Sequence, residues 1–258
     1  ISGRGEVPGN NFTTILYNGT SWTNNPAGLN TSRLSTAEAG TQTAGLIAAG
    51  FTPASSPSTA TEEFNGSSWT TVASVGTATY NMASGGTQTT AWKGGGATNS
   101  NATEEYDGSS WTAGGNMLAP QYYNTGAGTQ TAAMAVGGRR NNSPPANANT
   151  EEYDGSSWTA GGNYPTAVFG LGASGTQIDA LYFGGSGYST ASNSYNGTSW
   201  ASQPSIATGR QFSGFPTTGT STSAFMAGGR ATGGAATAAT EEFTGEIQAL
   251  GYKTLTSS

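Results

Sequence analysis

The chain has 258 residues, of which 41 are glycine and only 9% are charged, and its formal net charge is −6. Globular domains carry about 25% charged residues. Aromatic residues make up 10% of the chain and cysteine and histidine are absent. The aromatic content argues against disorder. The absences exclude disulfides, thiolate nucleophiles, Cys or His metal sites and triads with a histidine base. We therefore expect no metal and no cofactor.

The acidic balance leaves no basic stripe for nucleic acid, because the few arginines and lysines are scattered along the chain. No apolar run has the length of a membrane-spanning helix, so we expect no membrane insertion. The first residues, ISGRG, resemble the segment FMAGGR that ends at Arg230. We expect the chain to begin inside a repeat.

A hairpin motif recurs from Tyr17 onward. In each complete copy an aromatic residue precedes Asn-Gly or Asp-Gly, and a tryptophan follows the aromatic residue by five positions. The pairs are Tyr17 with Trp22, Phe64 with Trp69, Tyr106 with Trp111, Tyr153 with Trp158, and Tyr195 with Trp200. Successive tryptophans are 47, 42, 47 and 42 residues apart, and the stretch TEEYDGSSWTAGGN occurs twice, at 103–116 and 150–163. Asn-Gly and Asp-Gly favour tight hairpin turns, so each motif predicts two antiparallel strands. We expect the ten residues of the aromatic–tryptophan pairs to have a structural role.

Two more strands follow each tryptophan. The first ends near Gly-Thr-Gln or a related turn, and the second is a short apolar run that ends in Gly-Gly or Ala-Gly, such as AAMAV before Gly137. The inner pairs are predicted at 32–50, 80–96, 121–138, 168–185 and 211–229. A sixth copy of the aromatic strand ends at Phe243, with Gln248 in the tryptophan position.

Four antiparallel strands per repeat predict an all-β fold, a β-propeller of four-stranded blades. The Gly-Gly strand, the aromatic residue before Asp or Asn, and the tryptophan resemble the kelch repeat over nearly the whole chain. The resemblance implies that the tryptophan strand is the outermost of its blade and that the next strand is the innermost of the following blade. We predict a single domain over 1–258, with six blades favoured and five as the alternative.

Length differences between repeats are concentrated in the connection between the second and third strands. This connection and the one after each tryptophan leave the sheet at the same end, so we expect one variable face that presents binding loops. Its most distinctive loop holds Arg139 and Arg140, with Tyr122 and Tyr123 on a neighbouring segment. Aromatic, amide and guanidinium groups bind sugars by stacking and hydrogen bonding, and the alternative is a loop stiffened by prolines. Trp92 is predicted in the core.

Paired glutamates occur in four repeats, at 62–63, 104–105, 151–152 and 241–242. Neighbouring residues of a strand point to opposite faces, so the two carboxylates of a pair cannot readily share a catalytic site. We expect a repeated structural role for them and no enzymatic activity. A glycosidase-like enzyme remains an alternative.

The phrases TEEYDGSSWTAGGN and GTQTAAMAVGG and the C-terminal ATEEFTGEIQALGYKTLTSS are similar to kelch-type repeats of structural proteins in marine bacteriophages. The resemblance implies a virion or extracellular protein such as a tail fibre, appendage or decoration protein. Its expected partners are other virion proteins and host surface glycans or proteins, within a larger assembly. The other alternative is a secreted or cell-surface lectin with one sugar site per blade.

Overall fold

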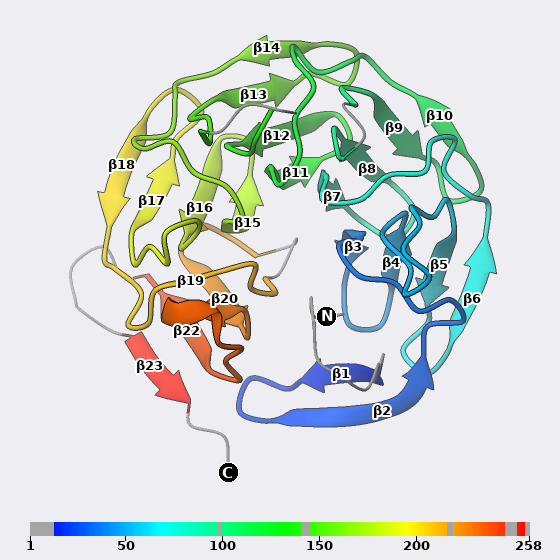
Figure 1. Cartoon of the computed structure of the whole chain (residues 1–258), viewed down its shortest axis with the longest axis horizontal. Helices are drawn as coiled ribbons and strands as arrows, with labels where there is room; N and C mark the ends of the chain where they lie inside the picture. Colours follow the sequence, from blue (N-terminus) through cyan, green and yellow to red (C-terminus); the bar gives the residue numbers. More distant parts are fainter. Residues whose placement is uncertain (1–12, 98–99, 141–144, 216–218, 246–251, 256–258) are drawn as a thin grey trace.

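The computed structural model describes residues 13–97, 100–140, 145–215, 219–245 and 252–255. Within these ranges the protein consists of antiparallel β-sheets with one short 3-10 turn, η1 (Thr232–Gly234). Figure 1 shows the sheets placed round a ring in the manner of propeller blades. The all-β class and the antiparallel, four-stranded sheets predicted from the repeat are confirmed.

Four sheets among the described residues have four strands each, in chain order. They are β3 (Ala37–Gly40), β4 (Gly45–Ala48), β5 (Thr61–Phe64) and β6 (Trp69–Val72); β7 (Ala83–Gly86), β8 (Ala91–Gly94), β9 (Thr103–Tyr106) and β10 (Trp111–Ala113); β11 (Thr125–Thr129), β12 (Ala132–Val136), β13 (Thr150–Tyr153) and β14 (Trp158–Ala160); and β15 (Gly172–Thr176), β16 (Asp179–Phe183), β17 (Ser192–Tyr195) and β18 (Trp200–Gln203). The first strand of each sheet lies toward the centre of the ring and the tryptophan strand lies at the rim (Figure 1).

Two smaller groups lie between β18 and β3 in the ring (Figure 1). One is the hairpin of β1 (Thr13–Tyr17) and β2 (Trp22–Gly28). The other holds β20 (Ser223–Ala227), β22 (Thr240–Thr244) and β23 (Tyr252–Leu255), with β19 (Arg210–Gln211) paired to β21 (Arg230–Ala231). The count of six blades stays a prediction, because the described residues at the first position form only two strands.

The last group departs from the predicted pattern in two ways. In the described part of the inner segment of the pair at 211–229, the contacts with β20 and its start are isolated bridges, which join Gly214 to Ala227 and Thr220 to Ser223. Phe243 pairs in register with Tyr252. Gln248, which the sequence spacing places in the tryptophan position, lies outside the described residues.

Each tryptophan of the repeat bonds to the sheet before it. Trp158 Nε1 donates a hydrogen bond of 2.8 Å to Thr103 Oγ1. The same bond joins Trp22 to Thr240, Trp69 to Thr14, Trp111 to Thr61 and Trp200 to Thr150. Because Trp22 bonds to Thr240, the β1–β2 hairpin and the last sheet are joined by the same contact that joins the other neighbouring sheets.

Whether the aromatic residue of a hairpin carries a hydroxyl follows the residue that stands just before the aromatic residue of the preceding repeat. Four tyrosine hydroxyls donate to the second glutamate of a pair: Tyr106 to Glu63, Tyr153 to Glu105, Tyr195 to Glu152 and Tyr17 to Glu242, at 2.9, 2.6, 2.5 and 2.7 Å. Burial, with the bond to Glu105, raises the pKa of Tyr153 to about 12. Phe64 instead follows a repeat with Leu16 at the glutamate position, and Phe243 follows one with Ser194. The hydroxyl is absent where its carboxylate acceptor is absent, which avoids burying an unsatisfied phenol.

The hydrophobic core lies between neighbouring sheets. One cluster joins Trp92 of β8 with Tyr153 and Trp158 of the next sheet, and the ring centroids of the two tryptophans are 5.6 Å apart. Trp92 is fully buried, as predicted. A Cβ added to Gly85 or Gly126 would lie 2.9 Å from the Trp92 indole, so these glycines make room for it. Among the described residues no helix is long and apolar enough to cross a membrane.

Candidate functional site

The first glutamate of each pair is buried and holds the connection that leads into its sheet. Glu104 accepts backbone N–H bonds from Gly76 and Thr77, at 2.6 and 3.1 Å, and a bond of 2.7 Å from Lys93 Nζ. Equivalent backbone bonds reach Glu62 from residues 30 and 31, Glu241 from residues 207 and 208, and Glu151 from Leu118. The predicted structural role of the glutamates is confirmed by these bonds.

Three of these four buried glutamates each pair with a buried cation. Arg33 pairs with Glu62, Lys93 with Glu104 and Arg210 with Glu241. Among the described residues, the side-chain donor to Glu151 is the neutral Gln121, at 3.1 Å. Burial raises the pKa of Glu151, although the Leu118 N–H and the charge of Arg140 act to lower it. In the next sheet the carboxylate is replaced by Asn193, which accordingly faces Tyr164 Oη at 2.8 Å.

Two kinds of connection meet on one face of the ring. The second glycine that ends each second strand donates its N–H to a carbonyl in the connection of the next repeat: Gly50 to Thr79, Gly96 to Gln121, Gly138 to Val168 and Gly185 to Arg210, each at 2.8 Å. These glycines have φ between 102° and 114°, a region that favours glycine. These bonds join neighbouring repeats on the face that is predicted to carry the variable loops.

Just before each inner strand one residue adopts a left-handed backbone. These residues are Ser35, Asn81, Tyr123, Gly170 and Phe212, with φ between 57° and 66°. Each backbone N–H in this series donates to the carbonyl of the preceding member, at 2.7 to 3.1 Å, from Asn81 round to Phe212. Bulky residues rarely adopt this conformation. The relay fixes two aromatic residues, Tyr123 and Phe212, at the inner edge of the variable face.

Tyr123 is the centre of an aromatic cluster. Its ring centroid lies 5.0 Å from that of Tyr122, 5.2 Å from that of Phe212 and 5.8 Å from that of Phe169, while Phe169 and Phe212 are 5.9 Å apart. All four rings are partly exposed. We call Tyr122, Tyr123, Phe169 and Phe212 the aromatic cluster.

Arg139 adds a cation to this cluster. Its guanidinium carbon lies 4.0 Å from the centroid of the Phe169 ring. Backbone bonds in both directions, 2.9 and 2.7 Å long, fix Arg139 to Tyr122. The buried Nε of Arg139 has no hydrogen-bond partner in the described structure. A buried donor without a partner is uncommon in proteins.

A small cavity of about 70 Å³ lies between the inner strands, next to the cluster. Tyr123 and Phe212 line it together with Asn124, whose buried carboxamide oxygen has no partner among the described residues. The arrangement offers aromatic surfaces for stacking, one guanidinium and an unsatisfied acceptor.

The structure brings together three of the four predicted site residues, Arg139, Tyr122 and Tyr123. The fourth, Arg140, is exposed, and its charge acts on Glu151. Phe169 and Phe212 were not predicted as site residues from the sequence. Both follow a tryptophan by 11 or 12 residues, as Tyr123 does, so alignment by distance from tryptophan would have found them.

No group of three or more acidic, histidine or cysteine side chains within the described residues is arranged to hold a metal ion. No protein-family model matches the chain, and no curated protein matches it in sequence. The resemblance to kelch repeats and to phage proteins therefore remains an interpretation of the repeated motifs.

Proposed function

We propose that this chain is a non-enzymatic virion protein, such as a tail fibre, appendage or decoration protein, that binds a host surface ligand through the variable face. The observation that carries the proposal is the aromatic cluster with Arg139, held by a hydrogen-bonded backbone relay at the centre of that face. Partly exposed rings and a guanidinium suit a glycan, which stacks on aromatic faces and accepts hydrogen bonds. Other virion proteins are the proposed partners of the rest of the molecule.

The distribution of aromatic residues favours one binding site over a site in every repeat. The positions equivalent to Tyr123 are Ser35, Asn81 and Gly170 in three of the other sheets. A lectin with one sugar site per blade would need the same side chains at each position. The single cluster therefore supports the adhesion protein over the repeated lectin.

The glycosidase alternative requires two free carboxylates beside a bound sugar. The buried glutamates are instead engaged by backbone N–H groups, as Glu104 is by Gly76 and Thr77. Their partners in the pairs accept tyrosine hydroxyls, as Glu105 does from Tyr153. These contacts support a binding role without catalysis.

Mass spectrometry of purified particles tests the virion assignment. Particles from the virus whose genome encodes this chain should contain it at a fixed ratio to the other structural proteins after density-gradient purification. Its absence from the particles, with presence in the medium of the producing cells, would refute the virion assignment and favour a secreted protein.

A further inference from the structure

The exposed charges of the protein are separated between the two ends of the sheets. Among the described residues, the acidic side chains that are exposed are those of Asp107, Asp154 and Asp179. They lie in or beside the turns β9–β10, β13–β14 and β15–β16. Arg139 and Arg140 lie in the connection from β12 to β13, and successive connections of an antiparallel sheet leave it at alternate ends. The exposed carboxylates and these two arginines are therefore at opposite ends of the sheets.

The ion pairs of the protein leave these two arginines out. Within the described residues, the ion pairs join the first glutamates of three pairs to Arg33, Lys93 and Arg210. The second glutamates accept tyrosine hydroxyls. Arg139 and Arg140 have no carboxylate of the described residues within ion-pair distance. The variable face therefore presents positive charge at this loop, although the net charge of the chain is −6.

The guanidinium of Arg139 is held where it can meet a second partner. Its carbon lies 4.0 Å from the centroid of the Phe169 ring, so the cation rests over the ring. The N–H donors of a guanidinium lie in its plane and form a rigid fork that matches the two oxygens of a carboxylate. The Arg139 side chain is partly exposed, and bonds to Tyr122 fix its backbone. Such a guanidinium can bind an anion while it stays over the ring, and it loses little side-chain freedom in doing so.

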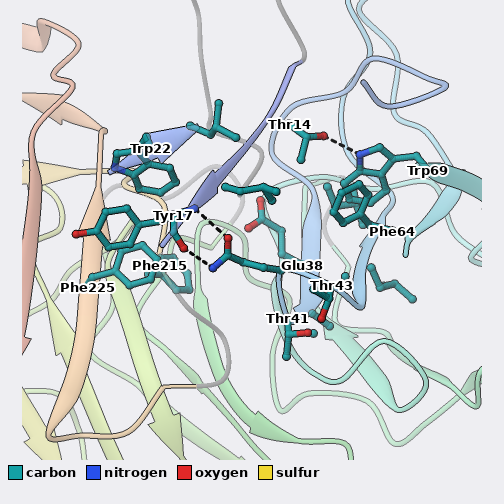
Figure 2. Close-up of a pocket in the computed structure, with 18 residues that line it drawn as sticks. Thr14, Tyr17, Trp22, Glu38, Thr41, Thr43, Phe64, Trp69, Phe215 and Phe225 are labelled. Carbon is teal, nitrogen blue, oxygen red and sulfur yellow. Dashed lines mark hydrogen bonds between the residues drawn. The ribbon is translucent and has the colours of Figure 1, made fainter. Parts of the chain in front are cut away.

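Two cavities of the protein do not suit an acidic ligand. One, of about 380 Å³, lies between the β1–β2 hairpin and the β3 sheet, with Tyr17 and Trp22 on one side and Phe64 and Trp69 on the other (Figure 2). The other is the cavity of about 70 Å³ beside the aromatic cluster. Glu38 lines both of them, and the described residues that line them include no arginine or lysine. An anion in either cavity would therefore lie beside a like charge.

A sugar at the aromatic cluster lies across the rings and not inside the cavity beside them. Ligand pockets usually have volumes of about 300–1,000 Å³, so the cavity of about 70 Å³ is too small to enclose a sugar ring. Tyr122 and Tyr123 are partly exposed, and their ring centroids are 5.0 Å apart, which gives a surface for stacking. A charge-assisted hydrogen bond is about twice as strong as a neutral one. On an open surface this bond therefore distinguishes ligands more than enclosure does.

We propose that the ligand of the aromatic cluster is a sugar that carries a carboxylate. The sugar ring packs on Tyr122 and Tyr123, and the carboxylate accepts N–H bonds from the edge of the Arg139 guanidinium, which stays over Phe169. The inference rests on the proposed binding function of this cluster and adds the chemical class of the ligand. Arg140 lies outside the contact, because neighbouring residues of an extended segment point to opposite sides.

A glycan array with paired probes tests the ligand class. The probes are polygalacturonate, alginate, hyaluronate and sialyllactose, each beside its carboxyl-reduced form, together with dextran sulfate. The unsubstituted protein should bind at least one carboxylated probe on the order of tenfold more tightly than the reduced form of the same probe. Arg139→Gln should remove this preference. Arg140→Gln is the matched control, since it changes the net charge by the same amount, and it should keep the preference.

The outcomes separate this inference from the proposed function. Equal binding of carboxylated and reduced probes, or a preference that folded Arg139→Gln retains, would overturn the carboxylate and leave glycan binding in place. Dextran sulfate bound as tightly as the carboxylated probes, or equal losses in Arg139→Gln and Arg140→Gln, would indicate non-specific attraction and would also overturn it. Binding of no glycan at all would overturn both this inference and the proposed function. The preference of the unsubstituted protein needs no variant, so it tests the inference even if Arg139→Gln does not fold.

Discussion

Replacing Lys93 by methionine removes the cation that faces a buried carboxylate. Lys93 Nζ lies 2.7 Å from Glu104 Oε1, and the two side chains are 1% and 8% exposed. Methionine keeps most of the apolar length of lysine, so the change removes charge with little loss of volume. Among the described residues, the Glu104 carboxylate would then keep the N–H groups of Gly76 and Thr77 as its hydrogen-bond donors.

Removing one partner of a buried ion pair costs about 3–5 kcal/mol in the free energy of unfolding. The two backbone bonds still stabilise the Glu104 carboxylate, so we expect a loss near the lower end, about 3 kcal/mol. The double variant Lys93→Met/Glu104→Gln leaves no charge, as in the sheet with Asn193, and should lie within about 1 kcal/mol of the unsubstituted protein.

Chemical denaturation at pH 7, followed by tryptophan fluorescence, measures these differences. Asp179→Asn is the surface control, because Asp179 is exposed, and it should change stability by less than about 0.5 kcal/mol. A loss below about 1 kcal/mol for the single variant, or an equal loss for the double variant, would refute the inference that charge matching sets these buried positions.

Three other substitutions test separate contacts. Burial raises the pKa of Glu151. A carboxyl group whose pKa is raised in the folded state makes the protein less stable as the pH rises above the ordinary pKa of that group. Glu151→Gln should therefore raise the melting temperature at pH 7, and this gain should vanish below the ordinary pKa of 4.5, whereas a gain independent of pH would contradict the assignment. Tyr153→Phe leaves Glu105 without its hydroxyl donor and should cost about 1–2 kcal/mol in denaturation experiments, and an unchanged stability would count against the inter-sheet bond. Gly138→Ala places a Cβ 2.9 Å from a backbone carbonyl, while Gly19→Ala meets nothing within 4 Å. Both glycines have positive φ, so Gly138→Ala should cost at least about 1 kcal/mol more than its control by the same assay, and equal losses would show that the clash is relieved.

The repeated hairpins were predictable from sequence because their determinants are local. Asp107 shows why: its carboxylate accepts the N–H groups of Ser109 and Ser110, 2.8 and 2.7 Å away, which closes the turn and lowers the pKa of Asp107 to about 2. The apolar run before Gly137 predicted β12 for the same reason. Side-chain and turn preferences that act within a few residues can be recognised from the sequence alone.

The aromatic cluster and the ion pairs depend on contacts between repeats. Phe169 and Phe212 stand in connections whose residues differ from copy to copy, and they meet Tyr123 only because the backbone relay brings successive repeats together. Lys93 lies on the second strand of its sheet, β8. In two other repeats the corresponding cation, Arg33 or Arg210, instead follows the tryptophan. Both features depend on which side chains of neighbouring repeats come into contact, and the motif within one repeat does not determine these contacts.

The proposed function rests on the aromatic cluster as the ligand site, and a glycan array with matched variants tests it most directly. Tyr80 is the control, since its ring packs against that of Phe51, with centroids 4.7 Å apart, and takes no part in the cluster. We predict that the unsubstituted protein binds a defined glycan set, that Tyr123→Ala loses on the order of tenfold or more in affinity, and that Tyr80→Ala retains binding. Binding by Tyr123→Ala equal to that of the unsubstituted protein would contradict the account.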